Sequence, residues 1–435
     1  MRRILIILIL LVTTTASAEA QVESGGRLTL EDAIARALEH NFDIRIANVT
    51  AEQAAANNTA GNAGLLPDVN ATGGVNYGLA NTRIEFADGR IQERNNAQTI
   101  SYNAAVTASY TLFAAGRAWL IRKQLRANEE LALVQVREQM QLIVSQVIQT
   151  YARVVWQKQQ VVAIDTGLAL AKVRMILSQV KFETGASAKV DYLQARVDYN
   201  ARQSDSLQQI SLLNSAFADL NFLMGTDPFL TWVTDDSLQI QLGLEPADKD
   251  RLRDLNLSLE VARRFADISD LNARISRTFM YPSLSANAGY NYSRTNSQAG
   301  FALFNQSSGP TVGLTMNAPI FQGGNLRREA KVATLQAFRD ELLYERQTTE
   351  IGRQYRTAWK DYEMAVASYR LELENIEYAR ENMDIQKARF RVGIATTIET
   401  REAENSYIQA LVRFYTAAYN VKVNETRVLE LESRL

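Results

Sequence analysis

The chain has 435 residues, a formal net charge of −1 at neutral pH and 22% charged residues. It has no cysteine and one histidine, His40, which excludes disulfides and thiolate metal sites and removes the usual side chains of zinc sites and general bases. The balanced charge argues against a nucleic-acid partner, which usually requires a basic face. We therefore predict neither an enzyme nor a resident cofactor or metal.

The N-terminal residues 1–18 have the pattern of a secretory signal peptide. Arg2 and Arg3 precede an apolar run over residues 4–12, and Ala16-Ser17-Ala18 provides a small-x-small cleavage site. The apolar run is too short to be a membrane anchor, because a spanning helix needs about 20 apolar residues. We expect an exported protein. No later segment is apolar enough for a membrane helix, so any insertion into a membrane would be as a β-barrel.

The chain repeats itself with one offset. Lys181-Phe182-Glu183-Thr184-Gly185 matches Arg389-Phe390-Arg391-Val392-Gly393, and 393 − 185 = 208. The same offset relates Phe113 and Gly116 to Phe321 and Gly324, and Tyr199 to Tyr407. We predict a first repeat over 19–225, a turn-rich segment over 226–246 and a second repeat over 247–435. Each repeat should hold a first helix (28–61 and 246–278), two strands, a very long helix and a returning helix.

Four runs alternate strictly between apolar residues and Asn, Ser, Thr or Gly. They span Val69–Leu79, Tyr102–Leu112, Leu284–Tyr292 and Val312–Ile320. Membrane-spanning strands of about 9–11 residues have this period, with an apolar lipid face and a polar interior. A soluble sandwich is the alternative, but its solvated face would normally carry Lys and Glu.

Four strands are too few to close a barrel by themselves, since about eight is the smallest common size. Open sheet edges are not tolerated in lipid, so copies of the chain must share one barrel. A trimer supplies 3 × 4 = 12 strands and a wide lumen. A dimer of eight strands would also close, but side chains would fill it.

The segment from Arg117 to Phe182 contains no proline and one glycine, Gly167, and its apolar residues recur with coiled-coil spacing. A helix of about 66 residues extends roughly 100 Å at 1.5 Å per residue, which is too long for a compact domain. Each half should therefore be a helical hairpin with its tip near Gly185 or Gly393.

An ordered set of short motifs resembles the TolC family of outer-membrane efflux proteins. The motifs are Leu28-Thr29-Leu30-Glu31-Asp32-Ala33 with Asn41, Leu66-Pro67, Leu223-Met224-Gly225, Tyr281-Pro282 and Pro319-Ile320-Phe321-Gln322-Gly323-Gly324. One departure is Phe42, where many members have proline. The resemblance implies a mainly α protein with a membrane β-barrel part: a homotrimeric 12-strand barrel continuous with an α-helical periplasmic tunnel. It also implies an outer-membrane location with a large periplasmic portion.

The same resemblance implies a gate at the tunnel tip. Glu399 and Glu402 fall where family members have an acidic ring, and they share a helix face because they are three residues apart. Asp191 matches an acidic residue of the gate links. Phe390 and Ala395 depart from the pattern, because a linking tyrosine and a linking arginine can occur there. A solvated helix face that also includes Arg401 and Glu404 remains an alternative.

We expect the protein to be a passive exit duct for small-molecule efflux, opened by an inner-membrane transporter and a periplasmic adaptor. The adaptor should contact the tips at Phe182, Gly185, Arg389, Phe390 and Gly393. Type I protein secretion is an alternative use of the same duct. A non-conducting periplasmic coiled-coil protein is an alternative of another class. An enzyme that pairs Glu399 with Glu402 as acid and base is disfavoured, because no phosphate loop or nucleophile motif accompanies them.

Overall fold

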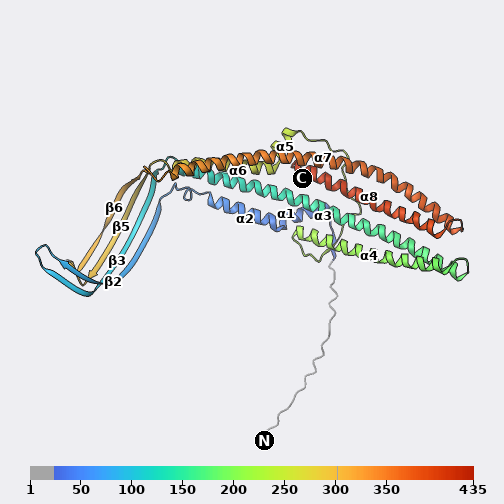
Figure 1. Ribbon diagram of the computed structural model, residues 1–435, viewed down its shortest axis with the longest axis horizontal. Helices are drawn as coiled ribbons and strands as arrows, with labels where there is room; N and C mark the ends of the chain where they lie inside the picture. The colour runs from blue at the N-terminus through green and yellow to red at the C-terminus, as the bar shows by residue number, and fades with distance from the viewer. Residues whose placement is uncertain (1–23, 301) are drawn as a thin grey trace, which may run out of the picture.

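The computed structural model describes residues 24–300 and 302–435. The molecule is elongated, with a sheet at one end and long helices over the rest of its length (Figure 1). The predicted signal peptide, residues 1–18, lies outside the described residues, and the repeat boundaries stay a prediction.

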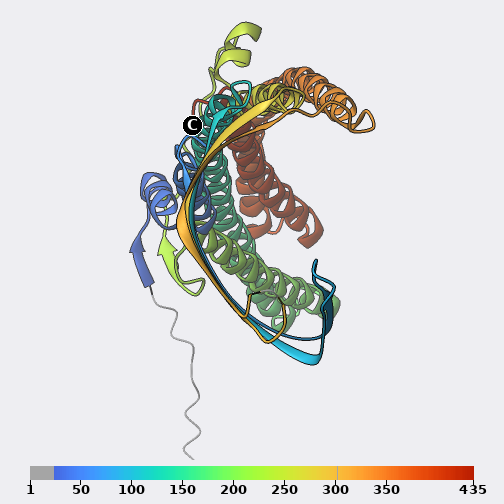
Figure 2. The same ribbon diagram turned by 90° about the vertical axis from the view of Figure 1, so that its left-hand side faces the viewer.

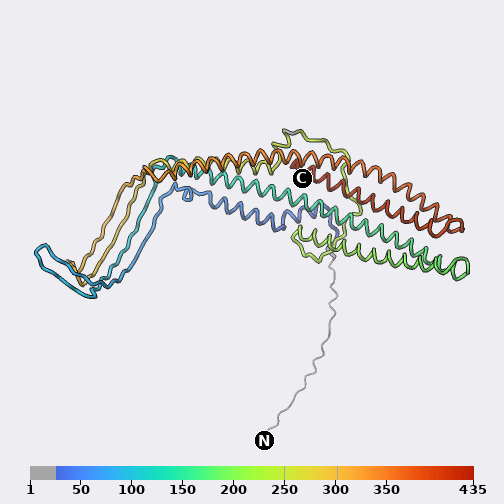
Figure 3. Tube along the Cα trace, viewed as in Figure 1, coloured from blue at the N-terminus to red at the C-terminus, as the bar shows by residue number. Residues whose placement is uncertain are grey.

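Eight helices are described between residues 24 and 435: α1 Leu30–His40, α2 Phe42–Asn57, α3 Arg117–Glu183, α4 Lys189–Met224, α5 Lys249–Leu255, α6 Leu257–Thr278, α7 Asn325–Arg391 and α8 Thr397–Leu431. The predicted offset recurs in their bounds: α3 and α7 have 67 residues each, and both ends lie 208 positions apart (325 − 117 and 391 − 183). The hairpins α3–α4 and α7–α8 run side by side with both tips at one end (Figures 1 and 3).

In the described part of the chain, no helix combines the length and the apolarity needed to cross a membrane.

The first helix of each half is broken, whereas the sequence predicted it to be continuous. Asn41 separates α1 from α2: its side-chain oxygen accepts hydrogen bonds from the N–H groups of Asp43 (2.9 Å) and Ile44 (3.2 Å). Asn256 separates α5 from α6 and caps the N–H of Leu259 (3.1 Å) in the same way. Asparagine side chains at such N-caps compete with the helical hydrogen-bond pattern of the preceding segment, and this explains both breaks.

The sheet has four antiparallel strands in the order β2-β3-β5-β6. Their bounds are β2 Asp68–Glu85, β3 Ile91–Phe113, β5 Ser283–Ser297 and β6 Phe304–Asn317. The strands are longer than the alternating runs, because both hairpins continue beyond them. The sheet curves strongly (Figure 2), and within residues 24–300 and 302–435 β2 and β6 have no further strand on their outer edges.

The strand register gathers the apolar residues on one face. Val75 pairs with Tyr102, and Val106 pairs with Tyr290, while Val312 pairs with Ala288 at the β6 edge. Polar side chains face each other on the opposite side. Examples are Ser101 with Thr295 (Oγ to Oγ1, 3.2 Å), and Asn291, whose amide donates to Thr311 (3.1 Å). The alternating pattern therefore produces one apolar and one polar face, as predicted.

A small parallel pair of strands, β1 Ser24–Arg27 and β4 Thr231–Val233, ties the start of the described chain to the segment between the two halves. The sequence predicted only turns there. The α4 helix is capped by Gly225, whose φ is +64° and where an added Cβ would lie 2.6 Å from the carbonyl oxygen of His40. Only glycine fits this close approach. The lone histidine is thus the last residue of α1, exposed to solvent.

Candidate functional site

Both hairpin tips make the same turn. Gly185 (φ +78°) and Gly393 (φ +82°) adopt the left-handed conformation that commonly ends helices at glycine. The N–H of Ala186 donates to the carbonyl of Lys181 (2.7 Å), and the N–H of Ile394 donates to the carbonyl of Arg389 (2.9 Å). The two Phe-x-x-Gly motifs are therefore helix-ending signals.

The two tips of one chain touch each other. The Nζ of Lys181 lies 3.9 Å from the ring centroid of Phe390, a cation–aromatic contact. Phe390 is buried, with 5% of its surface exposed, whereas Phe182 is 37% exposed and stacks on Tyr192. Of the five predicted adaptor contacts, Phe390 is thus covered by its own chain, and Phe182, Gly185, Arg389 and Gly393 face solvent.

The predicted gate acids lie at helix starts just beyond the tips. The carboxylate of Glu399 accepts hydrogen bonds from the backbone N–H (2.7 Å) and the hydroxyl (3.1 Å) of Thr396, closing a capping box on α8. These bonds lower the pKa of Glu399, the backbone bond being the larger cause and Arg389 a minor one. Glu402 follows one turn later and is exposed.

Asp191 is the repeat equivalent of Glu399, since 399 − 191 = 208, and lies in the first turn of α4. The cap residue there is Ala188, which has no hydroxyl to complete a capping box. Within residues 24–300 and 302–435, no hydrogen bond or ion pair joins Asp191, Glu399 and Glu402 to one another. One chain therefore holds all three acids near the tips without a direct bond between them.

A buried ionic network near the tips was missed by the sequence analysis. Arg174 of α3, which is 6% exposed, donates to Glu404 of α8 and to Asp198 of α4 (3.3 Å). Arg401 lies 3.7 Å from Asp198. The interpretation of Glu404 as part of a solvated face was wrong: it is 7% exposed. Glu404 precedes the buried residues Ile408 and Leu411 by four and seven positions, so the three lie on one face of α8. This spacing could have indicated that Glu404 is buried.

Burial raises the pKa of Glu404, and the nearby charges of Arg174, Lys387 and Arg202 oppose that rise. A second polar contact, from the guanidinium of Arg202 to the amide oxygen of Asn405 (2.7 Å), also joins α4 to α8. Together with Arg174, it fastens the α3–α4 hairpin to the α7–α8 hairpin of the same chain. We call the four residues Arg174, Asp198, Arg401 and Glu404 the internal latch.

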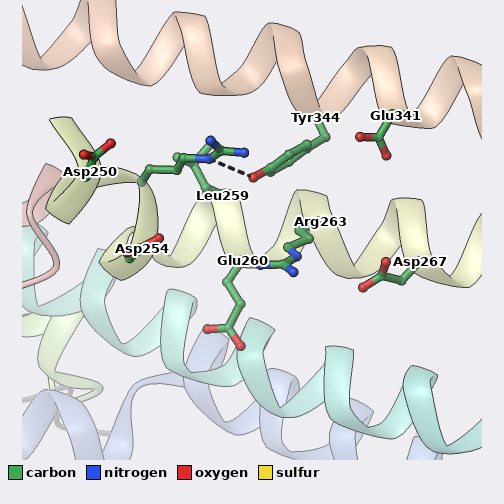
Figure 4. A pocket seen from close by; sticks show the side chains of 9 residues that line it. Asp250, Asp254, Leu259, Glu260, Arg263, Asp267, Glu341 and Tyr344 are labelled. Carbon is green, nitrogen blue, oxygen red and sulfur yellow. Dashed lines mark hydrogen bonds between the residues drawn. The ribbon is translucent and has the colours of Figure 1, made fainter.

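A hollow with a volume of about 560 Å³ lies on the surface far from the tips, between α5, α6 and α7 (Figure 4). Charges of both signs line it, and Arg253 donates to the hydroxyl of Tyr344 across it (3.5 Å). Figure 4 shows Glu260 pointing toward α3, where it pairs with Arg137 (3.3 Å). The charged side chains that line the hollow do not converge on one point. Across the described ranges, no group of three or more His, Cys, Asp or Glu side chains is placed to hold a metal ion.

A curved sheet with one apolar face, joined to helical hairpins about 100 Å long, defines a membrane channel protein of the cell envelope. The sequence profile described as "Outer membrane efflux protein" matches residues 33–226 and 250–431, and the chain belongs to this family. Its members are outer-membrane exit channels, not enzymes, so this chain is an outer-membrane protein.

Individual relatives are distant. The chain is 23% identical to outer membrane protein TolC of Escherichia coli, over 57% of this chain and 52% of that protein, so the match spans about half of that relative. It is 22% identical to the proteases secretion protein PrtF of Dickeya chrysanthemi, over 76% and 74% of the two chains. The fold is similar to that of the Campylobacter jejuni CmeC outer membrane channel, with a TM-score of 0.78 and 17% identity over 93% and 85% of the chains.

Proposed function

We propose that three copies of the chain assemble into one closed channel that lets cargo leave the cell across the outer membrane. The open sheet carries this proposal: the outer edges of β2 and β6 are 18 and 14 residues long and unpaired within the described chain. Unpaired edges are not stable in lipid. Pairing β6 of one copy with β2 of the next satisfies both edges, and three copies give a barrel with a lumen.

The apolar face of this barrel contacts lipid and the Asn, Ser and Thr face lines the lumen, which suits polar cargo and water. The helical hairpins continue the wall into the periplasm as a tunnel. The protein performs no bond chemistry and supplies no energy. An inner-membrane transporter delivers cargo, and a periplasmic adaptor docks on the exposed tip residues Phe182, Gly185, Arg389 and Gly393.

Three copies place Glu399 and Glu402 of each α8 around one axis, giving 3 × 2 = 6 carboxylates, with Asp191 on the neighbouring helices. The lowered pKa of Glu399 keeps its carboxylate ionised. A ring of carboxylates at a constriction favours cations. We propose that these acids set the ion selectivity of the closed tip and bind multivalent cations there.

Small molecules are the cargo we favour, and the likeness to PrtF, a protein named for secretion of proteases, supports secreted polypeptides as the second candidate. Export assays in a strain that lacks the protein distinguish them. If the duct serves efflux, its loss raises sensitivity to small toxic compounds. If it serves secretion, its loss retains a specific polypeptide inside the cell.

Single-channel conductance of the purified oligomer in a planar bilayer tests the duct. The parent protein should conduct with cation selectivity, and the double variant Glu399→Gln/Glu402→Gln should lose selectivity and block by divalent cations. The matched control, Glu341→Gln/Glu345→Gln, removes two exposed acids of α7 far from the tip and should behave like the parent. A well-folded oligomer that never conducts would refute the duct and favour the non-conducting coiled-coil alternative.

A further inference from the structure

Arg294 is the one charged residue in the sequences of β5 and β6, and it lies on the apolar face of the sheet. It follows Tyr290 and Tyr292 at the two-residue spacing that keeps side chains on one face of a strand. The register places it between Tyr102 of β3 and Gln306 of β6, and its side chain is exposed. A cation therefore lies on the face that the proposed duct turns toward lipid.

The position of Arg294 along β5 places it at the outer boundary of the membrane. The β5 strand begins directly after α6 and runs away from the helices (Figure 1). From Leu284 to Arg294 the chain advances ten positions (294 − 284). This is about 33 Å of strand, which a tilt of about 40° reduces to about 25 Å across the membrane. The apolar band of a membrane barrel has this height.

Exposed aromatic side chains mark both boundaries of this band. Tyr281 precedes β5 and Phe321 follows β6, at the helical end of the sheet, whereas Tyr102 and Phe304 lie next to Arg294. Aromatic side chains are enriched at both interfaces between membrane and water. Arg294 is therefore at the depth of the lipid headgroups in the outer leaflet.

No acidic side chain pairs with Arg294. Among the residues that the structure describes, it makes no hydrogen bond or ion pair, and its guanidinium lies over the ring of Phe304, 5.2 Å from the centroid. The arginines of β2, β3 and the loop between them each have a partner in the chain: Arg83 pairs with Glu93 (3.0 Å), Arg90 with Asp88 (2.7 Å), and Arg94 donates to the carbonyl of Gln298 (2.7 Å).

We propose that Arg294 binds the phosphate of a phosphorylated glycolipid in the outer leaflet. A guanidinium donates two parallel hydrogen bonds to a phosphate, and the ring of Phe304 supports it from one side. Gln306 and Ser308 add an exposed amide and hydroxyl on the same face, which suit the hydroxyl groups of a sugar. The acyl chains lie on the apolar residues nearer the helices, such as Val312. This inference rests on the proposed membrane duct, whose three copies provide three sites.

Native mass spectrometry of the detergent-purified oligomer, titrated with diphosphoryl lipid A, tests the site. The parent should retain one lipid per copy at Arg294. Arg294→Gln should bind at least about tenfold more weakly, the usual loss when a hydrogen bond to a charged group is removed. The matched control is Arg83→Gln, because Arg83 already pairs with Glu93, and it should bind like the parent.

Two further variants separate lipid binding from folding. Arg294→Lys keeps the charge but not the planar pair of donors, so its affinity should be intermediate. Gln306→Glu places a carboxylate directly opposite Arg294, which gives the guanidinium a partner in its own chain. It should weaken binding as Arg294→Gln does. Parental affinity in Arg294→Gln or in Gln306→Glu would overturn the inference.

The chemistry of the added lipid identifies the bound group. Lipid A stripped of its phosphates should bind the parent at least about tenfold more weakly. Excess inorganic phosphate should not displace intact lipid A, because the apolar face contributes to the affinity through the acyl chains. Displacement by inorganic phosphate, or equal binding of the dephosphorylated lipid, would refute the glycolipid assignment. Tighter binding of phosphatidylglycerol than of lipid A would also refute it, in favour of a phospholipid.

Conductance of the same oligomers distinguishes this site from the proposed duct. A parent that conducts, but retains no more lipid A than Arg294→Gln, refutes the lipid site alone. A parent that retains lipid A at Arg294 but never conducts supports the lipid site and refutes the duct. We expect the parent to do both, and Arg294→Gln to conduct while losing the lipid.

Discussion

Glu399 accepts hydrogen bonds from the N–H (2.7 Å) and the hydroxyl (3.1 Å) of Thr396, so one carboxylate both caps α8 and carries the charge proposed for the gate. The two roles can be separated. Glu399→Gln retains a side chain that can close a capping box but removes the charge. We expect it to lower cation selectivity, while the thermal midpoint falls only slightly.

The reverse separation uses Thr396→Ala, which removes the N-cap and keeps Glu399 charged. Loss of such a cap costs about 0.5–2 kcal/mol, so the free energy of unfolding should fall while cation selectivity stays. Denaturant unfolding and reversal potentials measure the two quantities. If both variants change both readouts equally, the cap and the gate charge are not separable.

The pH dependence of selectivity follows from the lowered pKa of Glu399, which the bonds from Thr396 cause. A carboxyl group with a depressed pKa in the folded protein contributes stability above its unfolded pKa, and this contribution is lost as the pH falls through the folded value. We therefore expect Glu399 to keep its charge, and α8 its cap, below the pH at which ordinary glutamates are protonated. In the Glu402→Gln variant, reversal potentials should show the remaining selectivity disappearing at a lower pH than in the Thr396→Ala/Glu402→Gln variant.

Breaking the internal latch from one side should destabilise the helical hairpins. Glu404→Leu leaves the buried Arg174 without its main partner, and removal of one member of a buried pair costs about 3–5 kcal/mol. The double variant Arg174→Met/Glu404→Leu removes both charges and should recover most of that loss. Chemical denaturation of the two variants gives the comparison, and a double variant less stable than the single one would contradict this account.

Tyr355 ties the segment before α5 to α7 and to the end of the chain. Its hydroxyl accepts from the N–H of Ala247 (2.7 Å) and donates to Glu432 (2.8 Å). Tyr355→Phe leaves these groups unpaired and should cost about 1–3 kcal/mol. The matched control, Tyr344→Phe, removes a hydroxyl that accepts one long bond from the exposed Arg253 (3.5 Å), and should change stability little.

Burial raises the pKa of Tyr355 to about 12, from the usual tyrosine value of 10.0. A raised pKa means that the unfolded chain loses this proton first, so stability is complete below pH about 10 and declines as the pH rises toward about 12. Alkaline unfolding followed by circular dichroism should show a smaller decline in Tyr355→Phe. An identical alkaline transition in that variant would assign the decline to other groups.

The orientation of the sheet can be tested on adjacent residues of β6. Val312 is 87% exposed on the apolar face, and an arginine facing the bilayer centre costs about 2–4 kcal/mol. We expect Val312→Arg to impair membrane insertion and Thr311→Arg, on the polar face, to insert and shift ion selectivity toward anions. Membrane fractionation and reversal potentials provide the readouts. The opposite result would place the polar face against lipid.

Periodicity was sufficient to predict the four strands and the two long helices, because period two and heptad spacing are local properties of the sequence. The faces of the sheet followed as well, since the register aligns Val106 with Tyr290. The helix breaks at Asn41 and Asn256 were missed. An asparagine within an apolar pattern caps a new helix only where the chain leaves the preceding helix, and the pattern does not show where this happens.

The candidate site was predictable only in part. Counting from the tip glycines located Glu399 and Asp191, but the capping bonds of Glu399 depend on Thr396, which the counting did not consider. The internal latch was missed because its members come from three helices. Asp198, Arg174 and Glu404 carry no shared local spacing, and their proximity depends on how the two hairpins dock.

The helices α3 and α7 have equal lengths, 67 residues each, and so act as a spacer of fixed length between the sheet and the tips. Seven residues add about 10.5 Å to a helix at 1.5 Å per residue. An insertion in α3 alone would push one tip beyond the other and move Lys181 off Phe390. Lengthening the spacer without disrupting its end therefore requires matched insertions in α3, α4, α7 and α8, so homologues adapted to envelopes of other widths should differ by coordinated multiples of seven in all four helices.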